Sequence, residues 1–134
     1  MRFITILFLL LSGSAFSQSD VLAKNYFDQG EYEKALSIYE TLYKQNPNRK
    51  EYFFHLVSTH QQLENFETAQ KLIETELAKF SNNATLYIEL GKNYLLKKEE
   101  DKARNNFNIA IETLEKQPNA AYTVGVAFEK HNLL

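Results

Sequence analysis

Residues 84–111 read ATLYIELGKNYLLKKEEDKARNNFNIAI and contain two apolar patterns of helical period. In the first half, apolar or small residues fall on one helical face: Tyr87, Leu90, Gly91 and Tyr94. In the second half, the same kind of face is formed by Ala103, Phe107 and Ala110. Residues at such steps share one side of a helix, and the polar KKEED segment between the halves suits a bend. We therefore predict a helical hairpin whose small residues let the two backbones approach.

The same pattern occurs twice more toward the N-terminus, at an interval of 34 residues. This interval separates three alanines: Ala35, Ala69 and Ala103. Thirteen residues before each alanine there is a leucine: Leu22, Leu56 and Leu90. Four residues after each alanine there is a large apolar residue: Tyr39, Ile73 and Phe107. A fixed period of this length indicates a series of similar hairpins.

A 34-residue period with this pattern resembles the tetratricopeptide repeat (TPR), a helix–turn–helix unit. The first copy adds Gly30 at the turn and Pro47 at the end of the unit. Two positions depart from the family pattern, because Glu76 replaces a small residue and Ser81 replaces the closing proline. The resemblance implies an all-α fold, an α-solenoid of antiparallel helical hairpins arranged as a TPR-like superhelix.

The period also sets the predicted organisation of a TPR domain over residues 18–134. Its repeats cover about residues 19–48, 49–83 and 84–117, and residues 118–134 form a partial repeat or a capping helix. In the first two repeats we expect these residues to face inward: Leu22, Ala23, Tyr26, Phe53, Leu56, Val57, His60, Phe66, Ala69, Ile73 and Leu77.

Residues 1–17, MRFITILFLLLSGSAFS, have the features of a secretory signal peptide. Arg2 gives a positive start, an apolar run follows to Leu11, and small residues precede a predicted cleavage before Gln18. The alternative is a retained membrane anchor, but the apolar run is shorter than the ~20 residues of a spanning helix. No cysteine is present for lipid attachment. We expect an exported chain without stable membrane insertion, periplasmic or secreted after cleavage.

Composition excludes several other classes of function. The chain carries a formal net charge of −2, and no basic patch indicates a nucleic-acid partner. The absence of cysteine removes disulfides, thiolate catalysis and cysteine metal sites. His55 and His60 are five residues apart and so do not share a helical face, while His131 lies near the end of the sequence. We predict no catalytic, cofactor-binding or metal-binding residues, and no enzyme activity.

The TPR resemblance implies that exposed residues on the first helix of each hairpin line a concave groove. Transferred position by position, the partner-binding residues are Lys24, Phe27, Phe54, His55, Ser58, Gln61, Ile88, Glu89, Lys92, Leu95 and Tyr122. Among them, Phe54, Ile88 and Leu95 are the predicted anchors. Lys24, Lys92 and Glu89 would set the orientation of the ligand. The alternative for each apolar residue is that it packs on a neighbouring helix and exposes little.

These observations predict a non-catalytic protein–protein interaction scaffold of the cell envelope that binds a peptide or helix of a partner. Two alternatives stay open because Val124, Val126 and Phe128 of the last helix have no following helix in this sequence to cover them. The C-terminal helix would then mediate self-association, or pack on further repeats of a longer protein. In the second case an enzymatic or signalling role would belong to a domain beyond residue 134.

Overall fold

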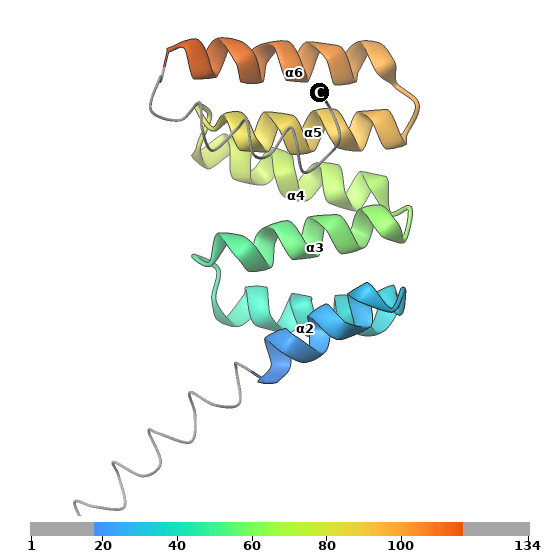
Figure 1. The fold of residues 1–134 in the computed structure, drawn as a ribbon. Coiled ribbons are helices and arrows are strands. Elements are labelled where there is room, and N and C mark those ends of the chain that lie inside the picture. The colour runs from blue at the N-terminus through green and yellow to red at the C-terminus, as the bar shows by residue number, and fades with distance from the viewer. Residues whose placement is uncertain (1–17, 117–134) are drawn as a thin grey trace, which may run out of the picture. The chain divides into compact units, whose positions relative to one another are not determined.

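The computed structural model describes residues 18–116, which contain helices and no strand (Figure 1). A first helix covers residues 18–28. It is followed by α2 (Tyr32–Gln45), α3 (Lys50–Gln62), α4 (Phe66–Lys79), α5 (Ala84–Leu96) and α6 (Glu100–Glu115). The predicted all-α class and the helix–turn–helix pattern are confirmed. The predictions for residues 1–17 and 118–134 concern parts of the chain outside the described residues.

The chain divides into two compact units, with the boundary after Glu64. In the first unit, the helix of residues 18–28 turns into α2 at Gly30, whose φ is +77°. The turn is closed by two backbone bonds, from Gly30 N–H to the Phe27 carbonyl at 3.0 Å and from Glu31 N–H to the Tyr26 carbonyl at 2.8 Å. The α2 helix then packs on α3 around these buried residues: Ala35, Tyr39, Leu42, Tyr52, Phe53, Leu56 and Val57.

One inward-facing prediction in this unit is wrong. Leu22 is 45% exposed, whereas its counterparts Leu56 and Leu90 are 4% and 6% exposed. The physical reason is position in the series: Leu56 lies on α3, which packs on α2, and Leu90 lies on α5, which packs on α4 and α6. No described helix precedes residues 18–28 to cover Leu22 in the same way.

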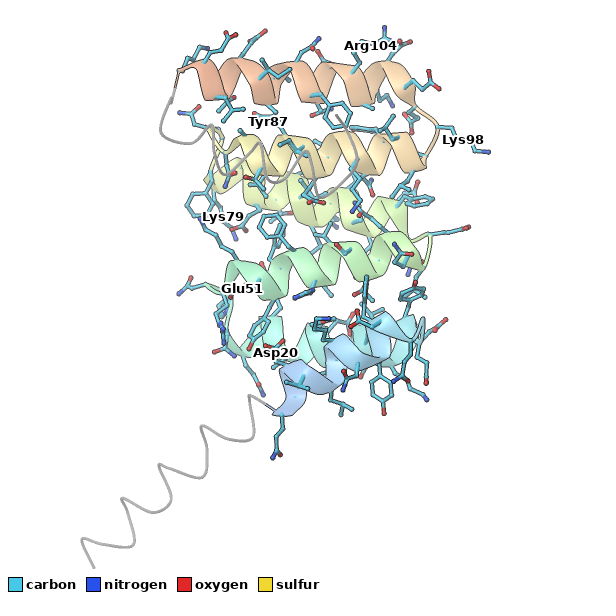
Figure 2. All side chains as sticks on the ribbon, in the orientation of Figure 1. Asp20, Glu51, Lys79, Tyr87, Lys98 and Arg104 are labelled. Atoms are coloured by element: carbon cyan, nitrogen blue, oxygen red, sulfur yellow. The ribbon has the colours of Figure 1, made fainter. Side chains whose placement is uncertain are left out.

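In the second unit, α5 lies between α4 and α6 (Figure 1). Asn83 caps α5, because its side-chain oxygen accepts hydrogen bonds from the backbone N–H groups of Thr85 at 3.1 Å and Leu86 at 3.4 Å. The α5–α6 hairpin closes on Gly91, where an added methyl group would meet the Phe107 ring at 2.4 Å. The predicted close approach at Gly91 is therefore present. At the turn between the two helices, Lys98 extends outward (Figure 2).

Candidate partner-binding surface

The predicted partner-binding residues are distributed over both units. Lys24 and Phe27 lie on the helix of residues 18–28, and the first unit also holds the four candidates on α3: Phe54, His55, Ser58 and Gln61. The second unit holds the four candidates on α5: Ile88, Glu89, Lys92 and Leu95. Tyr122 lies outside the described residues.

The two candidate phenylalanines of the first unit, Phe27 and Phe54, are half-buried and pack against other aromatic rings. Phe27 meets Tyr32 edge to face, with ring centroids 5.3 Å apart and planes at 68°. Phe54 meets Phe53 in the same manner at 5.3 Å and 74°. Edge-to-face contacts of this kind fix ring positions and leave part of each ring available. Both residues thus combine a fixed position with remaining exposed apolar surface.

Charge on the first helix is partly neutralised within the helix itself. The Lys24 ammonium lies 2.5 Å from the Asp28 carboxylate one turn later. Asp20 is half-buried, and no cation among residues 18–116 forms an ion pair with it. Asp20, Lys24 and Phe27 follow steps of four and three residues, so they share one helical face. This face carries an aromatic ring and an excess of negative charge.

His55 packs on a buried tyrosine of the neighbouring helix. Its ring stacks on Tyr39 of α2, with centroids 4.8 Å apart and planes at 9°. Tyr39 is completely buried, and no residue among those described forms a hydrogen bond with its hydroxyl. Burial raises the pKa of Tyr39 to about 12, and the carboxylates of Asp20 and Asp28 add to this shift. A signal was present in the sequence, because the equivalent positions hold Ile73 and Phe107, which have no polar side-chain atom.

The remaining α3 candidates are less accessible. Ser58 is half-buried, and Gln61 is only 3% exposed. His60, one residue before Gln61, is 7% exposed, as the predicted inward position requires. Burial lowers the pKa of His60, and the Glu40 carboxylate partly opposes this effect. Within residues 18–116 no group of three or more His, Asp or Glu side chains is placed to hold a metal ion.

On α5, Ile88 follows the packed alternative and Leu95 the exposed one. Ile88 is 0% exposed and belongs to a core cluster with Ala84 and Ala110. Leu95 is 38% exposed. Of the three predicted anchors, Ile88 therefore presents no surface to a ligand, while Phe54 is half-buried and Leu95 is open.

The two charged candidates on α5 lie one turn apart. Glu89 is 6% exposed, and its carboxylate lies 4.0 Å from the ammonium of Lys92. Because the Glu89 carboxylate is buried, neighbouring atoms restrict its movement. Glu89 is therefore less able than Lys92 to change its side-chain position when a ligand binds. The orienting roles proposed for these residues stay predictions.

A cluster of polar side chains around Lys97 was not predicted from the sequence, because some of its members are far apart in the chain. Lys97, at the end of α5, reaches Glu67 of α4 at 3.3 Å, Gln70 at 3.3 Å and Glu99 at 3.1 Å. Its side chain is 19% exposed, and the hydrogen bond to Glu99 is the largest cause of its raised pKa. Lys97 therefore links α5 to α4 through Glu67 and Gln70, and it also pairs with Glu99 in the turn after α5.

Among residues 18–116 no helix is both long and apolar enough to cross a membrane. None of the curated proteins matches the chain in sequence. Residues 21–49 match the family described as "Tetratricopeptide repeat". This match covers helix 18–28 from its fourth residue, the Gly30 turn and α2, and it confirms the resemblance there.

Solved structures extend the likeness of fold to most of the chain. SycD, the type III secretion translocator chaperone of Yersinia enterocolitica, is 16% identical with a TM-score of 0.70, over 96% of this chain and 96% of SycD. PcrH of Pseudomonas aeruginosa, in complex with the chaperone binding region of PopB, is 20% identical with a TM-score of 0.66. That likeness covers 85% of this chain and 92% of PcrH. SycD in complex with a peptide of the translocator YopD is 19% identical with a TM-score of 0.64, over 90% of this chain and 94% of SycD. The chain thus has a TPR-like helical-repeat fold.

Proposed function

We propose that this chain is a non-catalytic protein-binding protein that takes up a peptide or helix segment of a partner on its first-helix surfaces. The observation that carries the proposal is the apolar surface that each unit leaves open, at Phe27 and Phe54 in the first unit and at Leu95 in the second. Phe27 and Leu95 occupy the same position of the 34-residue period, at which the copy between them has Gln61, a polar residue that is 3% exposed. Apolar groups that stay open on a folded surface commonly mark contact sites.

Two similar structures support this proposal by what they hold. One is PcrH with the chaperone binding region of PopB, and another is SycD with a peptide of YopD. In both, a chain with a similar fold binds a segment of another protein. The transfer of that mode of binding to this chain is the proposal, and the half-buried aromatic rings of its first unit give the ligand a place to pack.

We also propose that the protein acts in the cell envelope or outside the cell. The support is the sequence of residues 1–17, with its positive start, its apolar run and its small residues before Gln18. N-terminal sequencing of the protein isolated from its own cells tests this. A mature terminus at Gln18 is the expected result, and an intact Met1 in a soluble cytoplasmic fraction would contradict it.

Affinity capture with matched variants tests the binding function. The bait is the whole chain, compared with a Phe54→Ala, Leu95→Ala double variant. The control is a Phe80→Ala, Ile111→Ala double variant, because these residues are 52% and 46% exposed but lie outside the predicted surface. We expect a partner that the wild type and the control retain and the Phe54/Leu95 variant loses. Equal capture by all three would refute the surface, provided that circular dichroism shows each variant to be folded.

A further inference from the structure

Tyr39 carries a hydroxyl group that the fold does not use. The residue is completely buried, and none of residues 18–116 accepts from or donates to its oxygen. A buried hydroxyl without a hydrogen-bond partner destabilises the folded state, so most such groups are paired. Packing does not require the oxygen, because Phe107 and Ile73 fill the equivalent positions of the other repeats.

The surroundings of this hydroxyl are negatively charged. Asp20 and Asp28, on the preceding helix, act electrostatically on Tyr39. Lys24 pairs with Asp28 and leaves Asp20 without a cation among the described residues. Phe27 lies on the same helical face as Asp20, two turns further on. An anionic or acidic ligand would be repelled here, whereas a basic group would be attracted.

One of the rings packed on Tyr39 belongs to a half-buried side chain. The His55 ring stacks on the tyrosine ring at 4.8 Å, and His55 itself keeps contact with solvent. Rotation of one partly exposed ring is a small change compared with opening a helix interface. The Tyr39 side chain is thus buried in the free protein, in contact with a ring that is itself half-buried.

We propose that Tyr39 is the hydrogen-bond donor of a ligand-reading site in the first unit, which binds a partner segment carrying Lys or Arg beside an apolar residue. The tyrosine hydroxyl donates to a carbonyl oxygen of that segment once the His55 ring turns aside. The basic side chain pairs with Asp20, and the apolar side chain packs on Phe27. This inference rests on the proposed function, and it adds the chemistry that the bound segment must have.

The test exploits a hydroxyl that costs stability in the free protein and contributes to binding. A phage-displayed library of random 12-residue peptides is selected on the whole 134-residue chain, and one selected peptide is synthesised with a fluorescent label. Tyr39→Phe removes only the oxygen. We expect the variant to melt at the same temperature as the wild type or higher, and to bind the peptide about three- to tenfold more weakly, as the loss of one hydrogen bond implies.

Tyr43→Phe is the matched control. Tyr43 lies one turn after Tyr39 on α2, is half-buried and contacts the Phe53 ring at 6.0 Å. This variant also loses one hydroxyl, and we expect its affinity to equal that of the wild type. Asp20→Asn should weaken binding of the selected peptide, and it should leave unchanged the binding of a version in which the basic residue is replaced by glutamine.

The outcomes separate this inference from the proposed function. If Tyr39→Phe binds as tightly as the wild type while Phe54→Ala, Leu95→Ala abolishes binding, the Tyr39 assignment is overturned and the proposed function stands. A lower melting temperature for Tyr39→Phe would also overturn the assignment, since the hydroxyl would then have a partner in the free protein. If no selected peptide distinguishes the wild type from the Phe54/Leu95 variant, both proposals fail.

Discussion

Within residues 18–116, one position of the 34-residue period has a positive φ in each of its three copies. Gly30, Glu64 and Lys98 are 34 residues apart, and they have φ values of +77°, +58° and +63°. Positive φ is easily adopted by glycine, but it brings the Cβ atom of other residues close to the backbone. The period found in the sequence is therefore also a period of backbone geometry, and only the first copy has the residue that suits it.

Gly30→Ala isolates the cost of this conformation. No atom lies within 4 Å of the position that a new Cβ would take, so the substitution creates no clash. We expect the free energy of unfolding to fall by about 1 kcal/mol because of the positive φ alone. Lys98→Ala is the control, since a side chain already occupies that left-handed turn and the change should be within about 0.5 kcal/mol. Urea denaturation measures both, and equal effects would contradict the explanation.

Individual residues also show where prediction from sequence stops. The packing of Gly91 against Phe107 could be predicted, because a small residue and a ring lie on the predicted inward faces of two adjacent helices. The burial of Ile88 could not, because it depends on Ala84 and Ala110 leaving room for it in the same cluster. A helical period predicts burial well at the centre of an apolar face. At the edge of that face, burial depends on which residues are adjacent in the tertiary structure.

At the scale of the helices, the same residue type has a different role in different copies. Leu22, Leu56 and Leu90 share one position of the period, but only Leu22 is open to solvent. Each helical repeat buries its apolar face mainly on the adjacent repeat, so the first described repeat exposes a leucine that the following repeats bury. The sequence pattern predicted the position of these leucines and missed the exposure of the first.

This difference predicts unequal effects of one substitution. Leu56→Ala should lower the free energy of unfolding by about 2 to 4 kcal/mol, since it leaves a cavity in a packed interface. Leu22→Ala removes a side chain that is nearly half exposed and should cost less than about 1 kcal/mol. Urea denaturation of the two variants gives the comparison. Equal losses of stability would show that Leu22 is covered in solution.

Helix ends could largely be predicted from sequence, whereas ties between helices could not. The α2 helix ends at Gln45, directly before the Asn46–Pro47 segment that was expected to stop it. The link from Lys97 to Glu67 joins residues 30 positions apart, and no local pattern indicates which acidic side chain a lysine will reach. Such contacts follow from the packing of α4 on α5 and need the tertiary structure to be seen.

For the molecule as a whole, both units contain groups with shifted pKa values, but the groups that titrate at neutral or acidic pH differ between the units. In the first unit, burial lowers the pKa of His60 below its usual value of 6.5. In the second unit, the pKa of Glu99 is lowered from 4.5, chiefly by its hydrogen bond to Lys102. The two units should therefore respond to acid in different ranges of pH, the first near neutrality and the second only below about pH 4.5.

The sign of the first effect follows from proton binding. The unfolded chain protonates His60 near pH 6.5, while the folded chain resists protonation, so the unfolded state holds more protons just below that pH. The first unit should lose stability as the pH falls from 7.5 to 5.5, and the second unit should change little over this range. Native-state hydrogen exchange of amides in α2 and α3, compared with those in α5 and α6, measures the two responses separately.

His60→Phe supplies an aromatic ring that cannot be protonated, in a position where the other repeats hold Tyr26 and Tyr94. We expect it to remove most of the acid sensitivity of the first unit. If the stability of α2 and α3 in this variant falls between pH 7.5 and pH 5.5 by as much as it does in the wild type, another group of the first unit, and not His60, causes the acid sensitivity.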